Sequence, residues 1–172
     1  IAVVPAAGNS IYDAANNAAA TSQSNNTVAL NDLAVPVIAS TSVNSANSEL
    51  TVTFAENVYD TTGGSGDLEV GDFAISISGG VATPVSATPT SIVRTSQTVW
   101  VLGFSTSVPA NGAETITVAP VSNSIYDGAA NIAATSQSNN TATLNDKAVP
   151  IILSATSNFN NTEMTVTFSE NV

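Results

Sequence analysis

Carboxylates are the side chains of this sequence best suited to chemistry, and they are unevenly spread along it. The chain has 13 acidic residues, and five of them fall within one short stretch: Glu56, Asp60, Asp67, Glu69 and Asp72. Clustered carboxylates with backbone carbonyls suit Ca²⁺, which takes about six to eight oxygen ligands. The two basic residues, Arg94 and Lys147, offer these acids little compensation. The stretch therefore predicts a composite Ca²⁺ site, without the pattern of an EF-hand.

Composition excludes several function classes. The chain has 172 residues, a formal net charge of −11, and neither His nor Cys. Ser-His-Asp, Cys-His and His-metal sites are therefore impossible, and so is a disulfide framework. Two cations cannot neutralise a phosphate backbone, which argues against nucleic acid as a partner. We expect no membrane span, because the chain lacks a run of about 18 apolar residues.

Catalysis is not expected either. Paired carboxylates are able to hydrolyse glycosides. The chain has a single Trp, however, and so lacks an aromatic platform for a sugar. We therefore expect the protein not to be an enzyme.

An internal repeat with an offset of 114 residues organises the sequence. Residues 9–13 recur as residues 123–127, and residues 21–27 recur as residues 135–141. About 34 of the 50 positions from 9 to 58 are identical at this offset. A unit of this length corresponds to a whole domain, not to one turn of a solenoid.

The repeat predicts the domain organisation. We expect residues 1–33 to be the C-terminal part of a preceding repeat, residues 34–147 to be one complete repeat, and residues 148–172 to be the N-terminal part of the following repeat. Because half a domain cannot bury its own apolar face, we expect the natural protein to be longer than this chain.

Alternation of apolar and polar residues predicts strands throughout the complete repeat. Leu50, Val52 and Phe54, for example, alternate with two threonines. The expected fold class is all-β, an Ig-like antiparallel β-sandwich of about seven strands in tandem repeats. We expect Trp100 to be a core anchor. The predicted strands lie near residues 35–41, 50–58, 73–78, 81–88, 98–104, 114–119 and 140–145, with residues 91–94 as a candidate extra strand.

The sandwich topology brings the acids together. When strands alternate in direction, the entering linker and the loops after the second and sixth strands lie at one pole. The candidate interdomain Ca²⁺ site at this pole comprises Asp32, Glu56, Asp60, Asp67, Glu69, Asp72 and Asp127. At the offset of 114 residues, Asp146 and Glu170 form the equivalent next joint.

Two simpler interpretations stay open beside the metal site. The acidic stretch is also typical of a solvated loop that keeps a protein soluble. Asp127 and its counterpart Asp13, both in an Ile-Tyr-Asp motif, are also typical of turn residues whose side chains accept backbone N–H groups.

The chain resembles the tandem bacterial Ig-like repeats of large cell-surface and secreted adhesins. The matching segments are residues 34–36, residues 50–58, residues 71–73 and residues 125–131. Family members often have Gly at the position of Ala130. Asn31-Asp32 and Asn145-Asp146, each followed after one residue by Ala-Val-Pro, are also similar to the linkers of cadherins, whose joints are stiffened by Ca²⁺.

The resemblance implies a non-enzymatic structural repeat of a long extracellular protein, fibre or sheath, which acts as a stiff spacer or in adhesion. Its partners would be neighbouring repeats. One alternative is an adhesin module that binds a cell-surface glycan or protein. Another is a self-assembling filament subunit, in which strands of one chain complete the sandwich of its neighbour.

Overall fold

The computed structural model describes residues 1–6 and 10–172, and the chain divides into two compact units. The units are Ile1–Leu33 and Ala34–Val172. Asn9, the first residue of the repeated motif, lies outside the described residues. Among the residues described, no helix has the length and apolar character needed to cross a membrane. The assignment of one complete and two partial repeats stays a prediction.

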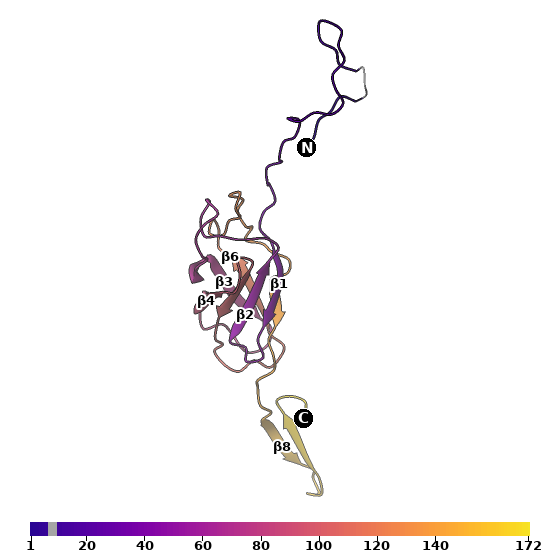
Figure 1. Cartoon of the computed structure of the whole chain (residues 1–172). Coiled ribbons are helices and arrows are strands. Elements are labelled where there is room, and N and C mark those ends of the chain that lie inside the picture. The colour runs from indigo at the N-terminus through magenta and orange to yellow at the C-terminus, as the bar shows by residue number, and fades with distance from the viewer. Residues whose placement is uncertain (7–9) are drawn as a thin grey trace. The chain divides into compact units, whose positions relative to one another are not determined.

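The larger unit contains a four-stranded and a three-stranded antiparallel sheet, both visible in Figure 1. The strand order is β1-β2-β5-β4 in the first sheet and β3-β6-β7 in the second. The elements of the two sheets are β1 (Ile38–Val43), β2 (Glu49–Phe54), β3 (Phe73–Ser78), β4 (Ser91–Arg94), β5 (Val99–Gly103), β6 (Thr115–Pro120) and β7 (Thr141–Thr143). A short 3₁₀ helix, η1 (Val70–Asp72), directly precedes β3.

This strand order confirms the predicted fold class. With β1, β2, β5 and β4 named A, B, E and D, and with β3, β6 and β7 named C, F and G, the sheets are ABED and CFG. That arrangement is the one of a seven-stranded Ig-type sandwich. Most predicted strands lie within a few residues of the observed ones, although β2 ends at Phe54 and not near residue 58.

The predicted strand at residues 81–88 is wrong, and β4 takes its place in the sheet. Pro84 makes an isolated bridge to Thr106, and Val85 donates its N–H to the Ser105 carbonyl beyond β5. Ala87, in contrast, accepts a hydrogen bond from Ile75 of β3, in the other sheet. The segment thus crosses from one sheet to the other, so it cannot continue a ladder in either.

The core lies between the two sheets and is built from alternating side chains. Leu50, Val52 and Phe54 of β2 are buried, and Phe54 meets Phe73 of β3 with ring centroids 6.3 Å apart. Trp100 of β5 is 1% exposed, which confirms it as a core residue. The burial follows from the pleat, because every second residue of a strand faces the same side.

A third antiparallel pair, β8 (Ile152–Ser157) and β9 (Met164–Phe168), follows the sandwich. Its register repeats that of β1 and β2. Ile152 lies opposite Phe168 as Ile38 lies opposite Phe54, and both ladders have an irregularity directly after that pair. All residues of β8 and β9 are exposed, whereas the matching apolar positions of β1 and β2 are buried.

The unit Ile1–Leu33 forms a few isolated bridges. Ala2 lies opposite Thr27, and the Val3 N–H donates to the Asn26 carbonyl. In the sandwich the Val118 N–H of β6 donates to the carbonyl of Asn140, which is the counterpart of Asn26. The counterpart of Val3 at the offset of 114 residues, however, is Thr117. The two related segments therefore pair in a similar way, but with a shift of one residue.

Glu114, directly before β6, is a fully buried carboxylate that ties two loops to the sandwich. One of its oxygens accepts the N–H groups of Val81 and Ala82, at 2.8 and 3.0 Å, and the other accepts the Asn111 N–H at 3.0 Å. Gly80 (φ +53°) packs against this carboxylate, and a Cβ there would lie 2.2 Å from Glu114 Cδ. No other residue type fits at that position without displacing the carboxylate.

Burial alone would raise the pKa of Glu114, but the backbone N–H donors outweigh it and hold the pKa below its ordinary value. A carboxyl group whose pKa is lower in the folded than in the unfolded chain stabilises the fold above its unfolded pKa. That contribution is lost as the pH falls through the folded value.

We expect Glu114→Gln to lower the free energy of unfolding at pH 7 by about 1–3 kcal/mol, because a buried backbone donor loses its acceptor. Urea denaturation followed by Trp fluorescence measures this. The difference in the free energy of unfolding between the wild type and the variant should narrow as the pH falls through the lowered pKa of Glu114, because the wild type then takes up a proton there. Glu163→Gln, at an exposed position, is the matched control. Equal free energies of unfolding for the wild type and Glu114→Gln at pH 7 would contradict this role for Glu114.

Candidate metal centre

Asp127 lies in the loop after β6 and holds that loop in one conformation. Its Oδ1 accepts the N–H groups of Ala129 and Asn131, at 2.8 and 2.7 Å, and its Oδ2 accepts the Asn131 side-chain amide at 2.7 Å. The residue is 1% exposed. A carboxylate offers about four acceptor sites, so roughly one site remains on Oδ2.

The pKa of Asp127 lies below its ordinary value. Burial would raise this pKa, but the hydrogen bonds from Asn131 and Ala129 outweigh burial. The carboxylate is therefore ionised at neutral pH, and it is mainly compensated by amide groups. The turn interpretation of Asp127 accounts for these contacts.

The same turn occurs at Asp13 in the other unit. Asp13 accepts the N–H groups of Ala15 and Asn17 on Oδ1, and the Asn17 side chain on Oδ2. Hydrogen bonds from Asn17 and Ala15 lower the pKa of Asp13. Sequence reasoning singled out the aspartates but missed Asn17 and Asn131. The available signal was an Asn four residues after each Asp.

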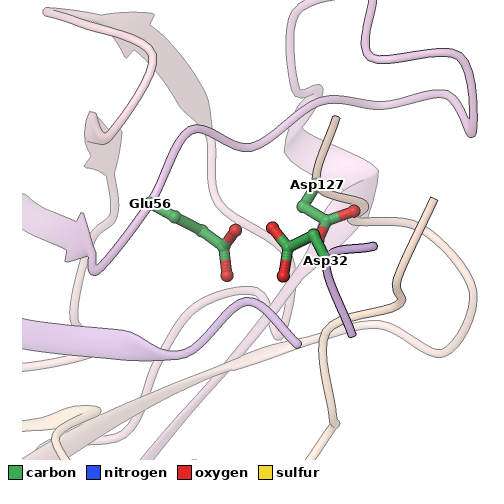
Figure 2. A group of neighbouring side chains, drawn as sticks. All are labelled: Asp32, Glu56 and Asp127. Atoms are coloured by element: carbon green, nitrogen blue, oxygen red, sulfur yellow. The ribbon is translucent and has the colours of Figure 1, made fainter. Parts of the chain in front are cut away.

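Glu56 and Asp127 are two predicted ligands that the larger unit brings together. Glu56 follows β2, and one of its carboxylate oxygens lies within 4.8 Å of one from Asp127. Figure 2 shows the two side chains pointing toward the same space. The figure also draws Asp32, which is exposed and belongs to the unit Ile1–Leu33.

Asp60, Glu69 and Asp72 form a separate acidic group around η1. Asp72 accepts the Glu69 N–H on Oδ2 at 2.7 Å and is 7% exposed. Burial raises the pKa of Asp72, and the negative charges of Asp60 and Glu69 raise it further, against the lowering effect of the Glu69 N–H. The three carboxylates therefore repel one another. The hydrogen bond that Asp72 accepts from the Glu69 N–H caps the short helix η1.

Asp67 is paired with a cation. Its carboxylate accepts a hydrogen bond from the Arg94 guanidinium of β4. The two side chains are 58% and 45% exposed, and ion pairs exposed to this degree stabilise a fold little. Asp67 is thereby engaged with Arg94 and not with the pair Glu56 and Asp127.

Asp146 and Glu170, predicted as the equivalent next joint, lie within the larger unit. Asp146 Oδ1 accepts the Ala148 N–H at 3.0 Å. Partial burial and the neighbouring charge of Asp146 raise the pKa of Glu170. The nine predicted ligands therefore divide among several groups, and the proposal of a metal ion stays a prediction.

Comparisons with known proteins give one structural neighbour. The N-terminal part of the bacterial S-layer protein SbsC is similar to this chain with a TM-score of 0.47 and 28% identity. The similarity covers 74% of this chain and 27% of that chain, so this chain spans about a quarter of the length of its neighbour. No family model matches the sequence, and no curated protein matches it.

The loop of Asp127 contains a residue with a strained backbone conformation, and a substitution can relieve this strain. Ala130 has φ of +70°, where an L-residue with a Cβ is unfavourable, and its counterpart Asn16 has φ of +67°. Asn tolerates this region better than Ala, and Gly tolerates it best.

We expect Ala130→Gly to raise the free energy of unfolding by up to about 1 kcal/mol, since it removes the left-handed strain at the cost of some chain entropy. Thermal unfolding in the same buffer measures this. Ala129→Gly is the control, because Ala129 has no positive φ, and we expect it to be destabilised by roughly 0.5–1 kcal/mol. Equal changes in the free energy of unfolding of the two variants would refute the backbone strain at Ala130.

Proposed function

We propose that this chain is a non-enzymatic structural segment of a long extracellular surface protein, in which Ig-type sandwiches follow one another as a spacer array. The observation that carries the proposal is the recurrence of two local structures at the same offset. The Asp13 and Asp127 turns share their hydrogen bonds, and the hairpins β1–β2 and β8–β9 share their register. Repetition of one fold along a chain is typical of proteins whose function is to span a distance.

The composition supports an extracellular setting. A formal net charge of −11 keeps the chain soluble and separate from other acidic surfaces. The buried carboxylates Glu114 and Asp127 are held by backbone and amide donors. Their contacts are those of structural residues.

The array model predicts the appearance of the native protein. In negative-stain images we expect a string of globules whose spacing corresponds to one sandwich per repeat. Antibodies raised against the chain should label intact cells of the source organism, because the array is expected at the cell surface. Labelling that requires permeabilised cells would refute the location, and a single compact particle would refute the array.

Filament assembly is the second candidate, and the hairpin β8–β9 favours it. Phe168 is 36% exposed and Met164 is 71% exposed, whereas the equivalent Phe54 and Leu50 are buried. An apolar strand pair of this kind is able to accept strands from a neighbouring chain. A regular helical filament in the same images would support this candidate over the spacer array.

The adhesin module has less support. Interfaces of that kind are typically anchored by aromatic or Arg side chains. Trp100 is buried in the core, and Arg94 is engaged by Asp67 and Gln97.

We also propose that Ca²⁺ binds at the carboxylate pairs Glu56–Asp127 and Asp146–Glu170. Burial and then the negative charge of Asp146 raise the pKa of Glu170, and a divalent cation would relieve the repulsion between these two carboxylates. With Asp127 contributing roughly one further oxygen, backbone carbonyls and water would supply most of the remaining ligands.

We expect the melting temperature of the 172-residue chain to rise by roughly 5–10 °C in Ca²⁺ at a hundredfold excess over its Kd, relative to EDTA. The double variant Glu56→Gln/Glu170→Gln should abolish this difference. The matched control is Glu49→Gln/Glu163→Gln, a second acidic pair at the same offset of 114 residues. Equal melting temperatures with Ca²⁺ and with EDTA would exclude the metal proposal while leaving the array model intact.

A further inference from the structure

The segment that leaves the sandwich after β7 is bound to the domain by its own backbone. The Leu144 N–H donates to the Glu114 carbonyl at 2.9 Å. Farther along, the N–H groups of both Lys147 and Ala148 donate to the Ala110 carbonyl, at 2.7 and 2.9 Å. The chain is thus held continuously to the loop before β6 up to Ala148.

Asn47, which lies in the turn between β1 and β2 of the other sheet, also hydrogen-bonds to this exit segment. We call the contacts of Ala110 and Asn47 with residues 145–148 the clamp. Asn47 is 7% exposed and has φ of +56°. Its side-chain amide donates to the Asn145 carbonyl at 2.7 Å, and its Oδ1 accepts the Asn145 N–H at 2.9 Å. Asn145 in turn donates its side-chain amide to the Asn44 carbonyl at 3.0 Å. The buried side chain of Asn47 therefore both donates to and accepts from the backbone of Asn145.

The following hairpin, β8–β9, begins its own hydrogen bonds at Ile151, a few residues after the clamp ends. Ile151 donates its N–H to Ser169 Oγ at 3.0 Å and accepts the Ser169 N–H at 2.9 Å. Between the last clamped residue, Ala148, and Ile151 there are two residues, Val149 and Pro150. Neither makes a hydrogen bond to any described residue.

These two free residues have little conformational freedom. Proline fixes its own φ near about −65°. The residue before a proline is restricted to extended conformations, and here that residue is Val149, whose branched side chain restricts it further. Val149 is 73% exposed and Ile151 is 56% exposed, so side-chain packing is not what restrains this stretch.

We infer that the clamp of Asn47 and Ala110 on residues 145–148, followed by the Val149-Pro150 pair, makes a stiff joint that needs no bound cation. The inference deepens the proposed function, on which it rests for its biological use, by naming the residues that would keep successive units from swivelling. Asn31, Asp32, Val35 and Pro36 repeat the joint sequence at the earlier position.

Backbone ¹⁵N relaxation on the 172-residue chain in EDTA tests this inference. For Asn145, Lys147 and Ala148 we expect order parameters near about 0.85, the value of rigid backbone. Asn47→Gly keeps the positive φ but removes the side chain, and it should lower the order parameter of Asn145 and its neighbours toward about 0.6. Pro150→Gly should loosen residues 149–151 while the clamped residues stay ordered. The indole signal of Trp100, the single Trp, reports that each variant remains folded.

Asn161→Gly is the matched control, because Asn161 occupies the same turn position in β8–β9 with φ of +54° and contacts no linker residue. It should leave residues 145–148 unchanged. Order parameters below about 0.6 at Lys147 and Ala148 in the unaltered chain would overturn the inference, and so would order that appears only after Ca²⁺ is added. Neither result bears on whether the protein forms a surface array, which the images and cell labelling decide separately.

Discussion

The fold depends on backbone N–H groups that take the place of missing cations. With 13 acids and two bases, the chain cannot neutralise its carboxylates with side chains. Glu114 and Asp127, which lie before and after β6, are buried and accept three hydrogen bonds each from amide groups. Hydrogen bonds to an ionised acceptor are stronger than neutral ones, and these keep both carboxylates charged inside the protein. The loops at the two ends of β6 are therefore fixed by the same kind of contact.

Several of the acids also make structural contacts that their clustering in the sequence does not indicate. Asp127 and Asp72 organise loops, and Asp67 is engaged by Arg94. Glu56 and Asp127, which are 71 positions apart in sequence, meet because β2 and β6 end at the same pole. Proximity in sequence was a poorer guide than topology, since neighbours in the stretch from Glu56 to Asp72 belong to separate contacts.

The sandwich could be predicted from sequence because its strands show a strict alternation that the core demands. The positions of Leu50, Val52, Phe54, Ile116 and Val118 follow directly from the period of a strand, and all five are buried. The segment 81–88 could not be predicted in this way, because its hydrogen bonds to both sheets are set by tertiary contacts. Glu114 was missed for a related reason. Its donors at Val81 and Ala82 come from another loop, and the pair Gly79-Gly80 was the sole local signal of a close approach.

The matching register of β1–β2 and β8–β9 has a consequence for how such a chain reaches its native state. The sheet that covers β1–β2 would meet nearly the same apolar face and the same irregularity on β8–β9. Neither hydrogen-bond register nor hydrophobicity distinguishes the two hairpins. When the chain refolds from denaturant, β1–β2 and β8–β9 therefore compete for the same place in the sandwich. Exchange of like elements is a characteristic failure of repeat proteins. Synthesis from the N-terminus removes the ambiguity, because β1–β2 emerges and finds its place before β8–β9 exists.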